Sequence, residues 1–234
     1  MSNLVAYKRN DAVSTIVIND GKANLMSTAM LGELHAALEQ ARSDGTVVVI
    51  TGRAGMFSAG FDLAVFKQGR GPLVEMLTAG ARMTETLLSF PAPVVVACSG
   101  HAVAMGLFVL LSADVRVGCA GEPYKLCANE VEIGLTVPRF AVETCRQRLA
   151  PAHFSRALLT AAPYSHDQGV AAGFLDLLVP KADLMATATA EAQRLAKLDR
   201  KSHTATKLRA RAGTLEALRL ATLADIDDWN QRLG

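Results

Sequence analysis

Two short glycine-containing segments constrain this chain more than any other feature of its sequence. They read GMFSAGFDL at residues 55–63 and SGHAVAMG at 99–106, and each follows an apolar, β-branched run, at 47–51 and 94–99. Such runs are typical of strands that are buried in a sheet. Each segment is therefore predicted to be backbone that leaves a buried strand and turns sharply. Two such turns can direct two backbone N–H groups at one point, which is what holding an oxyanion requires.

Strands and helices are predicted to alternate over most of the chain. Turn residues, caps and apolar spacing predict strands at 14–19, 46–51, 94–99, 114–118 and 175–179, and helices at 28–44, 72–90 and 107–113. From residue 181 onward only helices are predicted, with breaks near 199–200 and 213. The pattern indicates an α/β fold with largely parallel strands over 1–180. The helical region 181–234 would pack either on its own core or on a neighbouring subunit.

Charge and composition argue against several classes of partner. The chain has 24 basic and 22 acidic side chains, so its net charge of +2 favours neither nucleic acid nor an anionic membrane. A basic cluster between 194 and 211 is interpreted as a solvated helix face, with a phosphate contact as the alternative. It lacks the interleaved aromatic residues that would favour nucleic-acid binding.

The cysteines and the apolar segments point to a cytoplasmic protein. Cys98, Cys119, Cys127 and Cys145 form no CxxC pair and no zinc-ligand spacing, so we expect buried thiols and no metal site. The first residues do not have the pattern of a signal peptide. The longest apolar stretch, 102–113, is too short to span a bilayer.

Several motifs in a fixed order resemble those of one known family. Residues 24–27 are similar to N-A-L-[NS], 57–63 to F-[SC]-A-G-x-D-[LI], 100–106 to G-x-A-x-G-G-G, 129–134 to P-E-[VI]-x-x-G, and 171–176 to A-x-x-x-G-[LF]-[VL]-D. Asp114 also falls where that family has an aspartate. The chain thus resembles the crotonase family, the enoyl-CoA hydratase/isomerases, over nearly its whole length. The resemblance implies a spiral of ββα units with a helical C-terminal region, assembled as a homotrimer or a dimer of trimers. Residues 1–180 would form the acyl-CoA-binding core and 181–234 would contribute oligomer contacts.

The resemblance also implies a chemistry and the residues that perform it. Family members bind an acyl-CoA thioester, so coenzyme A enters as part of the substrate and no separate cofactor is expected. The backbone N–H groups of Phe61 and Met105 would hold the enolate oxygen, and Glu130 would be the base. A carboxylate that faces an apolar acyl pocket is a better base near neutral pH. Glu132, two residues further on, is interpreted as a bystander.

The remaining expected site residues would contact the substrate. They are Lys22, Ala23, Asn24, Leu25, Ala59, Gly60, Asp62, Leu63, Gly106 and Phe108. Lys22 could meet a phosphate of coenzyme A, and Lys67 and Lys207 are weaker candidates for the same role. Asp62 is expected to fix its turn by accepting from nearby backbone N–H groups rather than to act on the substrate.

One departure from the family pattern favours one reaction over another. Hydratases of the family carry a second glutamate where this chain has Phe108. A double-bond shift needs only one base, so the residues favour isomerisation of a 3-enoyl-CoA to a 2-enoyl-CoA. The alternatives are a 2-enoyl-CoA hydratase, a CoA thioester hydrolase or dehalogenase, and a non-catalytic acyl-CoA-binding member. A peptidase is disfavoured, because Ser58, Ser99 and His101 lie near the turns without a G-x-S-x-G elbow.

Overall fold

From the third strand to the eighth, successive strands alternate between two sheets in this computed structural model, which describes residues 4–232. The larger sheet has the order β1 (Val5–Asn10), β2 (Val13–Ile18), β3 (Val47–Thr51), β5 (Val94–Ala97), β7 (Val115–Cys119) and β10 (Leu177–Val179). The smaller has the order β4 (Gly55–Ser58), β6 (Gly100–Val103), β8 (Lys125–Cys127) and β9 (Tyr164–Ser165). Pairing is parallel except for β1 with β2 and β8 with β9. The predicted α/β class with largely parallel strands is confirmed.

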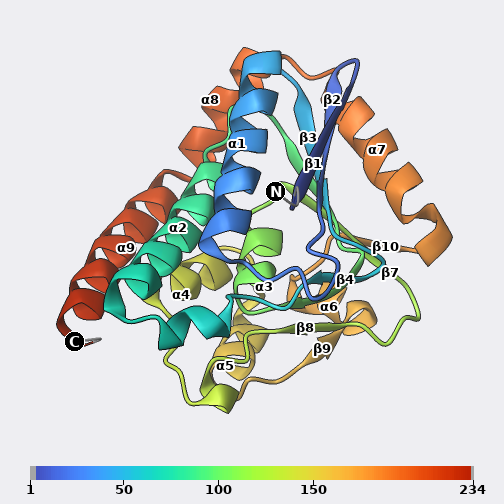
Figure 1. Ribbon diagram of the computed structural model, residues 1–234. Coiled ribbons are helices and arrows are strands. Elements are labelled where there is room, and N and C mark those ends of the chain that lie inside the picture. Colours follow the sequence, from blue (N-terminus) through green and yellow to red (C-terminus); the bar gives the residue numbers. More distant parts are fainter. Residues whose placement is uncertain (1–3, 233–234) are drawn as a thin grey trace.

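Each pair of strands is followed by a helix, which generates the predicted ββα spiral (Figure 1). The units are β3–β4–α2, β5–β6–α3 and β7–β8–α4. Their helices are α2 (Arg70–Leu88), α3 (Met105–Leu111) and α4 (Arg139–Arg146), with the short turns η1 (Leu63–Lys67) and η2 (Val131–Ile133) before α2 and α4. The other helical segments are α1 (Thr28–Asp44), α5 (Pro151–Leu159), α6 (His166–Ala172), η3 (Lys181–Asp183), α7 (Leu184–Leu195), α8 (Arg200–Ala210) and α9 (Ala212–Arg232).

The apolar run of β3 is uninterrupted because both faces of the larger sheet are covered. Val48 and Ile50 point into the main core, which α1 shares, whereas Val47 and Val49 point into a second cluster under α7. Successive side chains of a strand point to opposite faces, so a doubly covered strand is apolar at every position. Figure 1 shows α1 and α7 on either side of this sheet.

The predicted limits of α1 are confirmed by its caps. The Ser27 side chain accepts from the Met30 N–H, which satisfies one of the free donors of the first turn. Gly45 ends the helix at φ 68°, a left-handed conformation that glycine adopts without steric cost.

The glycine-containing segments differ from their prediction, because each begins as a strand before it turns. Residues 55–58 and 100–103 form β4 and β6, which pair in parallel, and the sharp turns follow at 59–60 and at Ala104. Glycine is required at position 100 for close approach. A Cβ there would lie 1.9 Å from the carbonyl carbon of Gly55.

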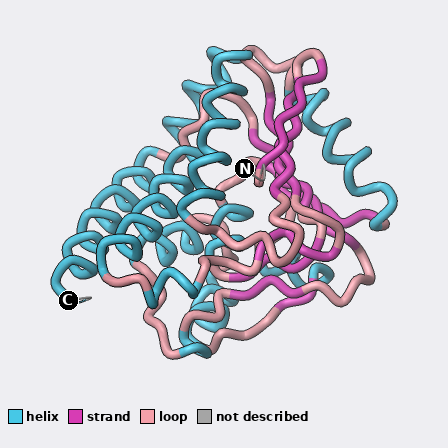
Figure 2. The backbone as a smooth tube through the Cα atoms, in the orientation of Figure 1, coloured by secondary structure: helices cyan, strands magenta, loops and turns pink. Residues whose placement is uncertain are grey.

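The C-terminal helices pack on their own chain. The helix α7 lies on the larger sheet, and α9 packs against α2 and α4 (Figure 2). Within residues 4–232, no helix combines the length and the apolarity needed to cross a membrane.

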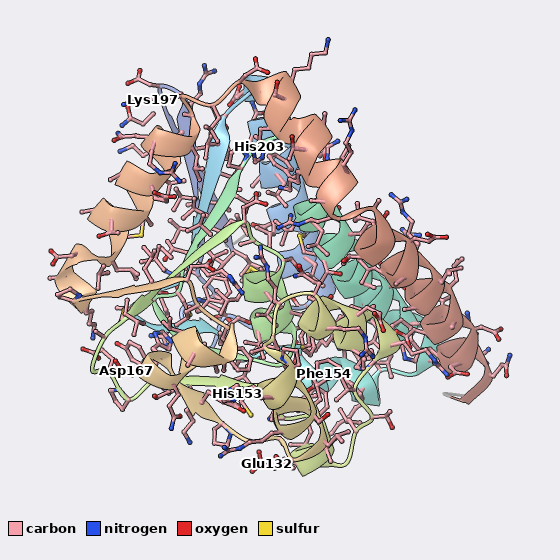
Figure 3. The ribbon with its side chains drawn as sticks, turned by 180° about the vertical axis from the view of Figure 1, so that it is seen from behind. Glu132, His153, Phe154, Asp167, Lys197 and His203 are labelled. Carbon is pink, nitrogen blue, oxygen red and sulfur yellow. The ribbon has the colours of Figure 1, made fainter. Side chains whose placement is uncertain are left out.

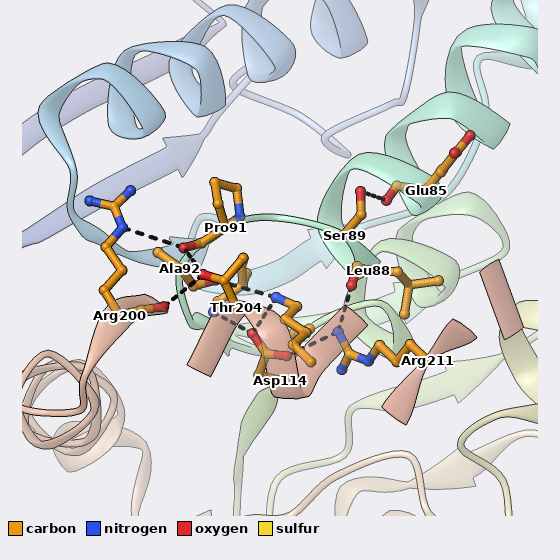
Figure 4. Close-up of polar contacts among 12 residues, drawn as sticks. Glu85, Leu88, Ser89, Pro91, Ala92, Asp114, Arg200, Thr204 and Arg211 are labelled. Atoms are coloured by element: carbon orange, nitrogen blue, oxygen red, sulfur yellow. Dashed lines mark hydrogen bonds and ion pairs between the residues drawn. The ribbon is translucent and has the colours of Figure 1, made fainter. Parts of the chain in front are cut away.

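The prediction that the basic cluster forms a solvated helix face is wrong for two of its members. Lys207 is buried, and its Nζ lies 2.7 Å from a carboxylate oxygen of Asp114; Arg211 Nη1 lies 3.0 Å from the other oxygen (Figure 4). Burial lowers the pKa of Lys207 to about 8, while Asp114 favours its charged form. Positions 207 and 211 are four residues apart and therefore share one face of the helical segment, here the face toward the core.

Candidate active site

The two turns that the sequence singled out lie against each other. A Cβ on Gly60, which has φ 96°, would lie 2.7 Å from the Ala104 Cβ and 3.4 Å from the Met105 nitrogen. The Ser58 hydroxyl fixes the first turn, since it accepts from the Gly60 N–H and donates to the Asn24 carbonyl. Glycine at position 60 therefore keeps the space between the turns open.

Two backbone N–H groups at these turns have no partner within the part of the chain that the structure describes. Between residues 4 and 232, neither the Phe61 N–H nor the Met105 N–H donates a hydrogen bond to another protein group. Met105 is the first residue of α3, where a helix leaves its N–H groups unpaired. The predicted pair of donors thus belongs to two segments in direct contact.

Ala104 is strained at the second turn. Its φ of 48° and ψ of −123° belong to a region that residues with a Cβ rarely adopt. Because the Ala104 Cβ also faces Gly60 at the turn contact, the strain is located where the two segments meet.

Replacing Ala104 with glycine should stabilise the protein. Glycine reaches these angles without strain, and relief of that strain outweighs the extra freedom of the unfolded chain, so we expect the free energy of unfolding to rise by about 1 kcal/mol. Urea denaturation of wild type and Ala104→Gly measures this difference in the free energy of unfolding. The control is Gly213→Ala, which also exchanges glycine and alanine but at an exposed position of α9. A lower free energy of unfolding for Ala104→Gly would contradict the assignment of strain.

Glu130 lies directly before η2 and is buried. Only 6% of its surface is exposed, and its Oε2 atom has no hydrogen-bond partner among the described residues. Burial raises the pKa of Glu130 to about 7, because desolvation penalises the charged carboxylate. A poorly solvated carboxylate with one oxygen left unpaired is suited to accept a proton near neutral pH.

Glu130 is shared by two cavities. The first, of about 450 Å³, is lined by Leu25, Ala59, Phe61, Asp62, Leu63, Ala64, Phe66, Ala104, Asn129, Glu130, Ile133 and Leu135. The second, of about 390 Å³, also contains Phe61, Phe66, Glu130 and Leu135 and extends to Trp229 of α9. The carboxyl group therefore lies where the two cavities meet.

The structure brings some of the predicted substrate-contacting residues to the first cavity and not others. Leu25, Ala59, Asp62 and Leu63 line it together with the predicted catalytic residues Phe61 and Glu130. The residues that line neither cavity are Lys22, Ala23, Asn24, Gly60, Met105, Gly106 and Phe108.

The residues outside the cavities have other contacts. Asn24 is buried, and its amide donates to the carbonyls of Ile18, Met56 and Phe57, so it ties its loop to β4. Phe108 is fully buried and packs edge-on against Phe140.

Two further carboxylates lie close to Glu130 in the sequence or in the first cavity, Glu132 and Asp62. Asp62 accepts from the Ala64 N–H and caps η1, as predicted. Glu132 is exposed and lies at the outer edge of the molecule (Figure 3). Neither is buried as Glu130 is.

The far wall of the second cavity was not predicted. It includes Asp225, Asp228 and Trp229, which share one face of α9. The single tryptophan of the chain among acidic residues at helical spacing was the available signal.

Comparison with known proteins identifies the family. The sequence profile described as enoyl-CoA hydratase/isomerase matches residues 8–230. A probable enoyl-CoA hydratase of Bacillus subtilis is 32% identical over 143 residues, which is 59% of this chain and about half (54%) of that protein's length. Enoyl-CoA delta isomerase 1, peroxisomal, of Arabidopsis thaliana is 30% identical over 174 residues, 72% of each chain.

Solved structures of similar proteins point to the same family. An enoyl-CoA hydratase of Mycobacterium marinum is 39% identical, with a TM-score of 0.91 and coverage of 99% of this chain and 100% of that one. An enoyl-CoA isomerase of Mycobacterium tuberculosis is 38% identical, with a TM-score of 0.92 and the same coverage. With the ββα spiral and the matching profile, these likenesses show that the chain belongs to the enoyl-CoA hydratase/isomerase (crotonase) family.

Proposed function

We propose that this protein moves the double bond of a 3-enoyl-CoA to give the 2-enoyl-CoA, with Glu130 as its single base. The carboxylate removes a proton from C2, and negative charge passes to the thioester oxygen. The N–H groups of Phe61 and Met105 stabilise this dienolate. Glu130 then returns the proton at C4, which leaves the double bond between C2 and C3.

The observation that carries the proposal is one buried carboxyl group, with an unpartnered Oε2 among the described residues, in a residue that lines both cavities. Asp62 caps η1, and Asp225 and Asp228 pair with Arg139. Among the described residues that line the cavities, Glu130 is thus the carboxyl available as a base. Hydration calls for a second carboxylate to position and activate water, and the corresponding position is the core residue Phe108.

Hydration of a 2-enoyl-CoA is the second candidate. It is favoured by the names of several relatives, since the B. subtilis and M. marinum proteins are called hydratases. Glu130 alone would then have to activate the attacking water.

Product analysis separates the two reactions. Purified protein is given a trans-3-enoyl-CoA of medium chain length, and in parallel a trans-2-enoyl-CoA, and the products are separated chromatographically. The proposal expects 2-enoyl-CoA from the first substrate and little 3-hydroxyacyl-CoA from the second. Rapid formation of 3-hydroxyacyl-CoA from the 2-enoyl-CoA, with no double-bond shift in the 3-enoyl-CoA, would contradict the proposed isomerisation and support hydration.

The rate should depend on the ionisation of Glu130. Since its pKa is about 7 in the free enzyme, kcat/KM should level off above about pH 7 and fall roughly tenfold per pH unit below it, where the protonated carboxyl cannot act as a base. Initial rates between pH 5 and pH 9 measure the profile. A kcat/KM that stays constant down to pH 5 would exclude a base with a raised pKa.

A further inference from the structure

The peptide group between Gly60 and Phe61 is held on its carbonyl side by a segment from elsewhere in the chain. Its oxygen accepts the Met26 N–H at 2.8 Å, and just before it the Ala59 N–H donates to the Ala23 carbonyl at 2.9 Å. The peptide group is trans and planar, so its C=O and N–H point in opposite directions. The bond from Met26 therefore sets the direction in which the Phe61 N–H points.

The N–H of Met105 is fixed in a different way. It shares its peptide group with the Ala104 carbonyl, which accepts the Phe108 N–H at 3.1 Å in the first turn of α3. This donor is thus fixed by the helix to which it belongs. The Phe61 donor depends instead on the loop between β2 and α1, which contains Met26.

Asn24 joins this loop to the strand that precedes the turn. Its amide donates to the carbonyls of Ile18, Met56 and Phe57 at 3.0, 3.2 and 3.1 Å, and its Oδ1 accepts the Asp20 N–H at 3.0 Å. Asn24 is fully buried, and its φ of 52° lies in the left-handed region, which asparagine enters more readily than most residues with a Cβ. It lines neither cavity, so this arrangement serves the backbone rather than a contact with a ligand.

Asp20 holds the same loop from within. Its carboxylate accepts the N–H groups of Lys22, Asn24 and Leu25 at 2.7, 2.9 and 3.0 Å. Partial burial opposes its charged form, but these backbone N–H groups outweigh that effect and lower the pKa of Asp20 below its ordinary value. The carboxylate is therefore charged near neutral pH and keeps the loop in one tight turn.

We propose that Asn24 and Asp20 are positioning residues: they hold the loop so that the Met26 bond keeps the Phe61 N–H directed at the thioester oxygen. A displacement of about 1 Å in a group that acts on the transition state can cost on the order of 10²-fold in rate, so neither residue needs to touch the substrate. This inference rests on the proposed function insofar as the ligand is an acyl-CoA thioester. It adds two residues, outside both cavities, on which one of the two donors depends.

Polarisation of a bound thioester carbonyl tests the inference without turnover. Octanoyl-CoA that is isotopically labelled at this carbonyl is bound to wild type, Asn24→Gly and Asp20→Asn, and the carbonyl stretch is recorded by infrared difference spectroscopy. Hydrogen bonds to a carbonyl lower its stretching frequency, so wild type should lower it relative to the free ligand. In both variants this lowering should be roughly halved, because one of two donors is misplaced while the Met105 N–H keeps its place. For the enoyl-CoA that wild type converts, kcat should fall about 10- to 100-fold while KM changes less than about threefold.

Matched variants separate positioning from a general loss of stability. Asn24→Gly removes the amide and keeps the left-handed backbone without strain. Asp20→Asn keeps the shape of a half-buried side chain and loses one acceptor, so it decides alone if Asn24→Gly does not fold. Thr46→Val removes a buried hydroxyl that bonds to Ser14 and to the Ala41 carbonyl, at the opposite end of β2 and β3 from the loop. It should lower the free energy of unfolding and leave the carbonyl stretch as in wild type.

The outcomes that would overturn the inference are distinct from failure of the proposed reaction. A stretch as in wild type in both loop variants would overturn it, and so would an equal change in Thr46→Val or no lowering in wild type. A stretch that depends on Asn24 and Asp20 in a protein that does not isomerise 3-enoyl-CoA would refute the proposed reaction and leave this inference standing.

Discussion

Replacing Glu130 with glutamine should lower kcat/KM for 3-enoyl-CoA isomerisation by roughly 10²- to 10⁴-fold, the range typical of a lost general base. The amide has nearly the shape of the carboxyl group but cannot accept a proton at neutral pH. Acyl-CoA affinity should therefore change little while turnover collapses. Single-turnover kinetics with excess enzyme, together with calorimetric titration of a saturated acyl-CoA, separates the two quantities.

A stability measurement on the same variant tests the physical cause. The folded-state pKa of Glu130 is about 7, above its ordinary value of 4.5, so its contribution to stability is full below pH 4.5 and is lost as pH rises through 7. Glutamine does not ionise and so loses no stability as pH rises, and Glu130→Gln should be more stable than wild type at pH 8 by about 3 kcal/mol. Glu132→Gln, at an exposed position, is the control. Full activity of Glu130→Gln would refute the single-base mechanism, and equal stability at pH 8 would refute the raised pKa.

The parts of the fold that could be predicted from sequence are those set by local chemistry. The β3 run of β-branched residues indicates a strand, and Ser27 and Gly45 mark both ends of α1. In each case one residue or one short window determines the outcome. The resemblance to the family then predicted the ββα spiral and placed Phe61 and Glu130 in one site. In the structure both residues line the first cavity.

The parts that could not be predicted depend on contacts between distant segments. Gly100 was interpreted as a turn residue, because no local signal distinguishes a glycine that bends the chain from one that lets two strands approach. Lys207 looked like a surface lysine, because its partner Asp114 lies 93 positions away in the sequence. The far wall at Trp229 was missed for the same reason: it exists only once α9 packs against α4.

Replacing Asp114 with alanine should destabilise the protein by about 3 kcal/mol, because it leaves two buried or half-buried cations without their counter-ion. Its carboxylate accepts from Lys207 and from the Val94 N–H and forms an ion pair with Arg211 (Figure 4), and so joins α8 to the start of β5. The cost should be at the lower end of the range for broken buried ion pairs, since Lys207 already has a pKa of about 8 and can release its proton. For that reason the loss of unfolding free energy in Asp114→Ala should be smaller at pH 9 than at pH 7. It should be smaller again when Asp114→Ala is made in a protein that already carries Lys207→Met. Urea denaturation at both pH values measures these differences, with Asp183→Ala, an exposed carboxylate, as the control. A loss below 1 kcal/mol at pH 7, or one that grows with pH, would mean that the cluster around Asp114 does not hold α8 against the sheet.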